Sequence, residues 1–167
     1  ALDENDEDLL WVRTDLADVK SALGRQLDAE KTYLHAIKVY EEIYGPDVVE
    51  LMPLWNGLGA IYLEFDRYLE AEKAFSRALK ISEKHHDEDH PGRAVCLMNM
   101  GILRRAQGQF LEAVELCERA MEIRKRVLGE EHVDVAYGRQ ALAGCYRMAG
   151  NYAAAEREAK AAQASME

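Results

Sequence analysis

The stretch WNGLGAIYLEFDRYLEAEKAF, residues 55–75, decides the fold. Its apolar and small residues follow the order W-x2-L-G-x2-Y and then A-x3-F, which two helices packed as a hairpin need. A single hairpin of this kind cannot bury its apolar face alone, so the pattern predicts repetition elsewhere in the chain. The positions concerned are Trp55, Leu58, Gly59, Tyr62, Ala71 and Phe75.

A shift of 42 residues brings small residues onto small residues along the whole chain. Larger residues keep the same register, so the sequence predicts four repeats at about 8–48, 49–90, 91–132 and 133–167, within a single domain covering 1–167. The small columns are Ala17, Gly59, Gly101 and Ala143; Ala29, Ala71, Ala113 and Ala155; and Ala36, Ala78, Ala120 and Ala162. The larger columns are Leu16, Leu58, Met100 and Leu142, and Tyr68, Phe110 and Tyr152.

Each repeat divides into two amphipathic helices around a short turn, which is GRQ, DRY, GQF or GNY. The small columns indicate helix crossings at which the backbones approach closely. We predict an all-α fold, an α-solenoid of four antiparallel helix pairs that forms a right-handed superhelix. The expected pairs lie near 8–22 and 27–43, 49–64 and 68–84, 91–106 and 111–127, and 134–148 and 153–166.

The amino-acid composition limits the partners and the cellular location that we expect. With 31 acidic against 21 basic residues, the net charge of −10 argues against a nucleic-acid partner. The three cysteines form no C-x-x-C motif and favour a reducing compartment, so we expect a cytoplasmic protein. No run of 18 apolar residues occurs, and we expect no membrane insertion. Because the chain begins with Ala, we expect it to be processed or to be part of a longer protein.

These residues resemble the tetratricopeptide repeat over nearly the whole chain. The period of 42 exceeds the usual 34 of that repeat, and the longer form resembles the repeats of kinesin light chain. Kinesin light chain repeats carry a signature like LG-x-x-H-P-x-V-A after the second helix. It is matched here by Leu128, Gly129, His132, Val135 and Ala136, and by His90, Pro91 and Ala94. The heptad region of a complete kinesin light chain does not occur in this sequence.

The first helices of such a solenoid line a concave groove, and we predict that this groove binds an extended peptide segment of a partner protein. The lining is apolar in the middle and carries two arginines towards its C-terminal end, which suits an acidic segment with apolar or aromatic anchors. The resemblance to kinesin light chain implies cargo peptides of the same kind. The predicted contact residues are Asn56, Leu63, Met98, Asn99, Ile102, Arg105, Tyr137, Gln140 and Arg147.

Each of these residues also has a purely structural interpretation. A neighbouring helix could cover Met98 and Ile102, and Asn99 could be an inert polar residue. Arg105 and Arg147 could pair with Glu112 or Glu156 on the same repeats. These alternatives remain open at the level of the sequence.

The remaining candidates for chemistry are weak. HHDEDH, residues 85–90, contains metal-compatible side chains but lacks the spacing of a known site, so we predict a solvated acidic loop and no metal. Cys117 occupies a core column, and no glycine-rich phosphate loop is present. We expect no catalytic residues, no cofactor and no enzyme activity.

Two further functions stay possible from the sequence. The Ala-rich end of the chain, with Ala159, Ala161 and Ala162, would leave an apolar face for self-association or interdomain docking, including a homodimer through terminal helices. The chain could also be the docking segment of an enzyme encoded elsewhere in a longer protein.

Overall fold

The computed structural model describes residues 15–17 and 19–165, and these form helices and turns without a strand. Residues 15–17 and 19–22 are helical, and seven complete helices follow: α2 (Gln26–Tyr44), α3 (Leu51–Glu64), α4 (Tyr68–His85), α5 (Pro91–Ala106), α6 (Phe110–Leu128), α7 (Val133–Met148) and α8 (Tyr152–Ala164). The predicted all-α class of helix pairs is therefore confirmed. The predicted residues 8–14 and 166 lie outside the described residues. None of the described helices is long and apolar enough to cross a membrane.

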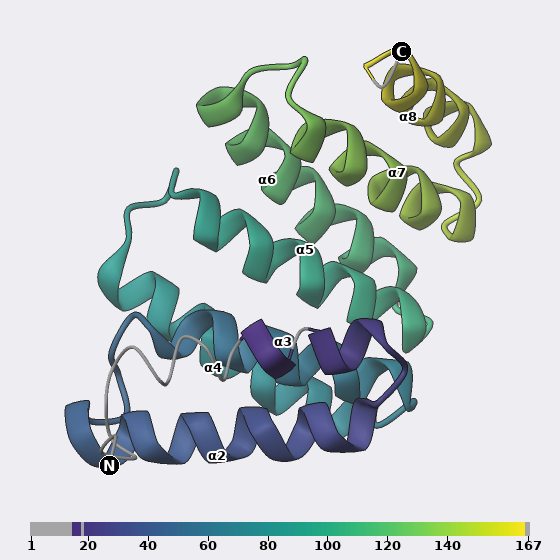
Figure 1. Cartoon of the computed structure of the whole chain (residues 1–167). Helices are drawn as coiled ribbons and strands as arrows, with labels where there is room; N and C mark the ends of the chain where they lie inside the picture. The colour runs from purple at the N-terminus through teal and green to yellow at the C-terminus, as the bar shows by residue number, and fades with distance from the viewer. Residues whose placement is uncertain (1–14, 18, 166–167) are drawn as a thin grey trace. The chain divides into compact units, whose positions relative to one another are not determined.

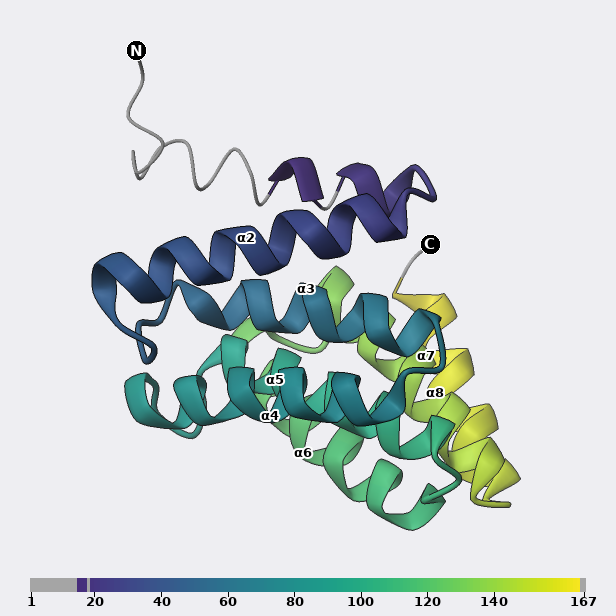
Figure 2. The same cartoon turned by 90° about the horizontal axis from the view of Figure 1, so that it is seen from below.

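The chain consists of two compact units, the first ending at Ile81 and the second starting at Ser82 within α4. In the first unit, α2 packs against α3 (Figure 2). In the second unit, α5 packs on α6, α6 on α7 and α7 on α8, and α5 also touches α7 (Figure 1). Each unit thus has its own layers of helices, and the predicted single domain over all four repeats remains a prediction.

The turn inside each helix pair depends on a residue with positive φ. This residue is Gly24, Gly108 and Gly150 in three repeats, with φ of 73°, 79° and 80°, and it is Asp66 in the remaining repeat, with φ of 55°. Glycine adopts this conformation without a steric penalty, and aspartate tolerates it better than most other residues. The Tyr68 hydroxyl donates a hydrogen bond to Oδ1 of Asp66 at 2.6 Å, which helps to hold the aspartate turn.

The small columns lie where helices approach most closely, as the sequence predicted. An added Cβ on Gly59 would lie 2.5 Å from Cε1 of Phe75, and an added Cβ on Gly101 would lie 2.5 Å from Sγ of Cys117. Phe75 and Cys117 are themselves fully buried. The glycines therefore let the second helix of each of these pairs seat a larger side chain against the first.

The histidines of the kinesin-light-chain-like signature cap helices. Nδ1 of His90 accepts a hydrogen bond from the backbone N–H of Gly92 at 3.0 Å, before α5. Nδ1 of His132 likewise accepts one from the N–H of Asp134 at 3.1 Å, before α7. Each bond satisfies a backbone donor that the first helical turn leaves without a partner. The spacing of the signature thus marks the start of the first helix of a repeat.

His86 makes the stability of the second unit depend on pH. Its ring stacks on that of His90 at 3.4 Å between centroids, and its Nδ1 lies 3.3 Å from Oγ of Ser82. Burial, together with the nearby charges of His90 and His85, lowers the pKa of His86 from 6.5. The stability that depends on neutral His86 is therefore complete above the ordinary pKa and is lost as the pH falls through the lowered pKa.

Below pH 6.5, we expect the natural protein to lose stability relative to the His86→Gln variant. The quantity compared is the free energy of unfolding of the two proteins at the same pH. Urea unfolding of both proteins at several pH values measures this difference. Any pH dependence that the two proteins share cancels in the comparison. A difference that stays constant across the histidine range would contradict the expectation.

Candidate functional site

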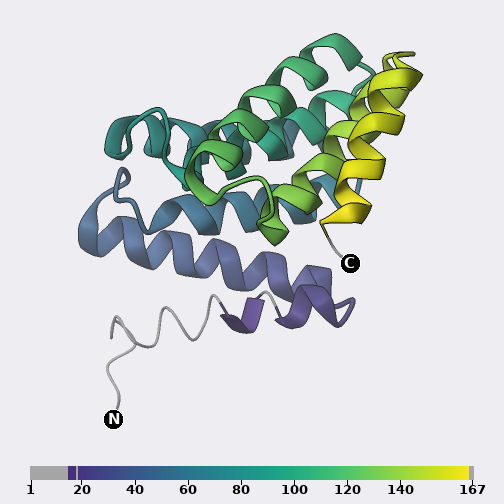
Figure 3. The same cartoon turned by 90° about the horizontal axis from the view of Figure 1, so that it is seen from above.

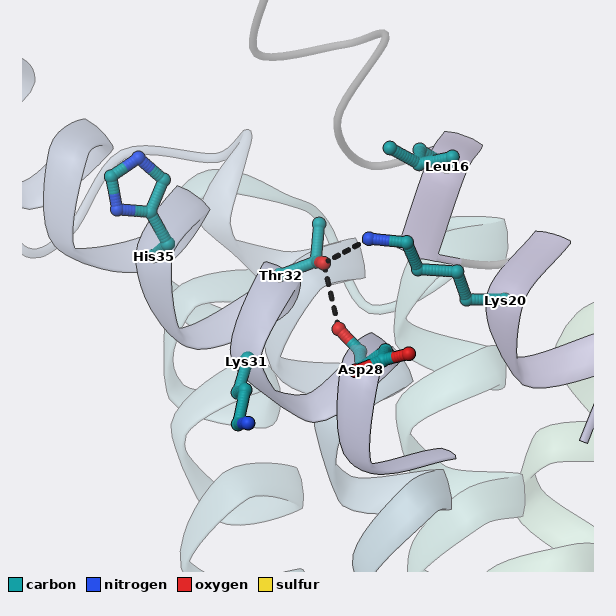
Figure 4. Close-up of a pocket in the computed structure, with 6 residues that line it drawn as sticks. All are labelled: Leu16, Lys20, Asp28, Lys31, Thr32 and His35. Atoms are coloured by element: carbon teal, nitrogen blue, oxygen red, sulfur yellow. Dashed lines mark hydrogen bonds between the residues drawn. The ribbon is translucent and has the colours of Figure 1, made fainter. Parts of the chain in front are cut away.

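The first unit has a cavity of about 370 Å³ beside α2, lined by Leu16, Lys20, Asp28, Lys31, Thr32 and His35 (Figure 4). Nζ of Lys20 donates a hydrogen bond to Oγ1 of Thr32 at 3.0 Å, and that hydroxyl donates to the Asp28 carbonyl at 2.7 Å. Lys31 points away from this pair of bonds. The hydrogen bonds of this cavity link the helical residues 19–22 to α2. The polar groups that line the cavity do not point towards one common position.

The predicted contact residues of the first unit lie on α3. Leu63 is half-buried, whereas Asn56 is only 7 % exposed. Ala60, which lies between them on the same face, is exposed. Asn56 therefore presents little surface to a partner, and the roles of Asn56 and Leu63 remain predictions.

On α5, three of the four predicted residues reach the surface. Asn99, Ile102 and Arg105 are half-buried, while Met98 is 4 % exposed. The Cε of Met98 lies 3.5 Å from the point that a Cβ of Gly138 would occupy, so α7 covers this methionine. Coverage by a neighbouring helix therefore explains Met98, whereas part of Ile102 stays at the surface.

On α7, the predicted residues share one exposed face. Tyr137, Gln140 and Arg147 are all exposed, and their spacing of three and seven residues places them along one side of the helix with Gly144. Arg105 reaches this face from α5, because a Cβ on Gly144 would collide with its Nη1. The structure thus brings the Arg105 guanidinium of α5 onto the same face as Gln140 and Arg147.

The two arginines of this face have no hydrogen-bond or ion-pair partner for their side chains within residues 15–17 and 19–165. The glutamates that the sequence offered as partners pair with other cations. Glu112 binds Nε of Arg104 at 2.9 Å, and Glu156 binds Nζ of Lys160 at 2.6 Å. The interpretation in which Arg105 or Arg147 pairs with Glu112 or Glu156 is therefore wrong.

A cavity of about 430 Å³ adjoins Arg147 and is lined by residues of α7 and α8. Figure 3 shows the backbones of these two helices next to each other at the C-terminal end of the chain. Small residues form much of its wall, and Tyr152, which is 70 % exposed, stands at its edge. Of the predicted contact residues, Gln140 and Arg147 line it. The full lining is Gln140, Ala143, Gly144, Arg147, Tyr152, Ala155, Glu156 and Ala159.

Sequence reasoning missed the contribution of Tyr152 to this region, whereas Gly144 falls on the predicted groove-facing side of its helix with Gln140 and Arg147. Tyr152 belongs to a column with Tyr68 and Phe110, which indicated packing and not exposure. Gly144 leaves room for the Arg105 side chain, and this role can be recognised only in the structure.

Reactive side chains do not gather on this face. Within the described residues, no three His, Cys, Asp or Glu side chains come together as metal ligands. Cys96, Cys117 and Cys145 are buried and form no disulfide. The chemistry that the face offers is therefore recognition, through two guanidinium groups, a glutamine amide and an adjoining cavity.

A scan against protein-family models matches the tetratricopeptide repeat at residues 9–47, 50–115 and 97–167. The chain belongs to the tetratricopeptide repeat family. Repeats of this family are in general non-enzymatic scaffolds for protein–protein interaction, and the coarse function of this chain follows from that membership. A search among curated proteins found no significant match.

Solved structures share this tetratricopeptide repeat fold. BtubC (BKLC) from P. vanneervenii is similar over 96 % of this chain, with a TM-score of 0.82 and 23 % identity. This chain spans 65 % of BtubC, which is less than two thirds of its length. Two structures of nearly identical TPR-like repeats from Podosopora anserina, in a protein described as a kinesin light chain, have TM-scores of 0.76 and 0.73 at 21 % identity. Both matches cover 99 % of this chain. They cover 78 % of the first matched chain and 79 % of the second. The predicted resemblance of the repeats to those of kinesin light chain is confirmed at the level of fold.

Proposed function

We propose that this tetratricopeptide repeat protein is an adaptor that binds an extended, acidic segment of a partner protein on the shared face of α5 and α7. The face is defined by Asn99, Ile102 and Arg105 of α5 and by Tyr137, Gln140 and Arg147 of α7. It belongs entirely to the second unit, so the proposal does not depend on how the two units are arranged.

The observation that carries the proposal is the pair of unpartnered arginines. In a chain of net charge −10, acidic residues outnumber basic ones, yet Arg105 and Arg147 form no ion pair within the described residues, because Glu112 and Glu156 pair with Arg104 and Lys160. A guanidinium donates two parallel hydrogen bonds to a carboxylate and thereby selects for acidic ligands. Two such groups on one face suit a segment with two acidic residues.

Apolar anchors of the segment have two places beside these charges. Ile102 is a half-buried apolar residue within the face on α5, and the cavity between α7 and α8 adjoins Arg147. A cavity of about 430 Å³ with alanines in its wall has room for an aliphatic or aromatic side chain. Gln140 offers both a donor and an acceptor to the backbone of an extended segment.

Titration with short peptides tests the proposal. We expect peptides that carry two acidic residues beside an aromatic or aliphatic anchor to bind the whole chain, and to bind more weakly as the salt concentration rises, because exposed charge pairs are screened. Peptides with lysine in place of the acids are the matched control. Equal binding of the acidic and the basic peptides would refute the assignment of this face.

Self-association is the second candidate function, and the cavity between α7 and α8 favours it. Ala143, Ala155 and Ala159 in its wall form a surface of small residues on which a helix of a second copy can pack closely. A mass that rises with protein concentration in the same samples, without binding of any peptide, would select this function over the adaptor.

A further inference from the structure

Two cysteines meet in the core of the second unit. Sγ of Cys117 on α6 lies 3.5 Å from Sγ of Cys145 on α7, and both side chains are fully buried. Figure 1 shows these two helices side by side, and they are in direct contact. The pair is distinct from the face of α5 and α7 described above.

The repeat register places cysteines in two apolar columns here. In the other repeats, the column of Cys117 holds Tyr33, Phe75 and Ala159, and the column of Cys145 holds Val19, Ile61 and Leu103. A cysteine buries less apolar surface than the aromatic and branched residues of these columns, so the cysteine pair contributes less to the core through burial alone. Cysteines occupy both columns only where the two columns meet between α6 and α7.

We propose that Cys117 and Cys145 form an oxidisable dithiol, which a hydroperoxide converts into a disulfide between α6 and α7. A disulfide needs a sulfur–sulfur distance of about 2.05 Å, so the two atoms must approach by about 1.5 Å. Side-chain rotation and a small helix shift cover such a movement. On the α5 side, Gly101 packs directly against the Cys117 sulfur, because an added Cβ there would lie 2.5 Å from Sγ.

The chemistry balances with a hydroperoxide as the oxidant. The thiolate of one cysteine attacks the peroxide, an S–O bond forms, the O–O bond breaks, and the leaving oxygen takes a proton to form water or an alcohol. The sulfur of the other cysteine then attacks the sulfenic sulfur, the S–S bond forms, the S–O bond breaks, and hydroxide leaves with the remaining thiol proton as water. Two electrons pass from the two thiols to one peroxide.

Either thiol can donate the hydrogen bond between the two sulfurs, and this bond lowers the pKa of the thiol that accepts it. Burial raises the pKa of both thiols, and the charge of Arg105 lowers it. Because both sulfurs are buried, the peroxide reaches them only when α6 and α7 separate transiently, and the reaction is expected to be slow.

The disulfide regulates the face proposed above, and this part rests on the proposed function. Arg105 lies near both thiols and against Gly144, the residue that precedes Cys145. Drawing Cys145 towards α6 moves Gly144 relative to Arg105. We expect the oxidised protein to bind the acidic peptides more weakly, by about threefold or more.

Peptide mapping by mass spectrometry tests the disulfide on the whole chain. The protein is treated with hydrogen peroxide, quenched, unfolded, alkylated with N-ethylmaleimide and digested. We expect a linked peptide pair containing Cys117 and Cys145 that has lost two hydrogen atoms, with Cys96 alkylated. Cys96→Ala keeps this link, and Cys117→Ala and Cys145→Ala each lose it.

Alkylation of both Cys117 and Cys145 after peroxide treatment would overturn the proposal, as would a link to Cys96 or separate oxidation of the two sulfurs. The natural protein alone decides this, so the result does not depend on the folding of a variant. Titration of the oxidised and reduced proteins with the same acidic peptide then tests regulation, which equal dissociation constants would refute. Absence of peptide binding to the reduced protein would reject the proposed function and leave the disulfide result standing.

Discussion

The double variant Arg105→Glu, Arg147→Glu is expected to lose binding of acidic peptides by about 100-fold or more. Each reversal removes a charge-assisted hydrogen bond and places two carboxylates against each other, and close charge pairs at interfaces contribute about 2–5 kcal/mol when one partner is lost. Neither arginine pairs with an acid within the described residues, so helicity and the unfolding midpoint should change little. Peptide titration and circular dichroism on the same samples measure both quantities.

The variant Arg119→Glu, Arg157→Glu is the matched control. It changes the net charge by the same amount, and both arginines are exposed on the second helices, α6 and α8. We expect it to weaken peptide binding only slightly, through the general field of the protein. An equal loss in the two double variants would show that net charge, and not the face of α5 and α7, governs binding. Unchanged affinity in the first variant would reject the assignment of Arg105 and Arg147.

Gly101→Leu is expected to destabilise the protein by about 3 kcal/mol. A Cβ at this position lies 2.5 Å from Sγ of Cys117 and 3.1 Å from the carbonyl oxygen of Ala113. The second of these atoms belongs to the backbone of α6, so the helices themselves must separate to admit the side chain. Denaturant unfolding, with a shifted midpoint and an unchanged slope, measures the effect.

Gly144→Leu tests whether this cost comes from the close helix approach and not from loss of a mid-helix glycine. Its Cβ meets only the end of the Arg105 side chain, which is flexible, and the cavity between α7 and α8 lies beside it. Removal of a helical glycine gains up to about 1 kcal/mol of helix propensity. We expect its stability to stay near that of the natural protein, and a loss as large as that of Gly101→Leu would contradict the packing argument.

The helices could be predicted because the repeat supplies four versions of the same pattern. Every described boundary of the complete helices lies within two residues of its predicted position, and the turns fall on the predicted GRQ, DRY, GQF and GNY. The small residues of one column need large or polarisable residues opposite them, as Gly59 and Phe75 show. Because the pattern recurs every 42 residues, the pairing of a small residue with a larger one opposite it can be recognised in the sequence itself.

The candidate site was less predictable, because a register places residues on a face without showing what lies above it. Met98 was predicted to contact a partner, but Gly138 lets α7 approach and cover it. Arg104 and Arg105 are adjacent, and only side-chain geometry decides that Glu112 binds Arg104. The contact between the two cysteine sulfurs joins different repeats, so it also required three-dimensional information.

The hydrogen bond from Tyr68 to Asp66 bears on how an array of this kind diversifies after duplication. Three repeats have glycine at this turn and need no hydrogen bond from the residue two positions later. That residue is Gln26, Phe110 or Tyr152. In the repeat with Asp66, the tyrosine hydroxyl compensates for a residue that is less suited to the left-handed conformation. During such diversification, a substitution at position 68 is expected to weaken the aspartate turn, whereas a glycine turn does not depend on the side chain two residues later.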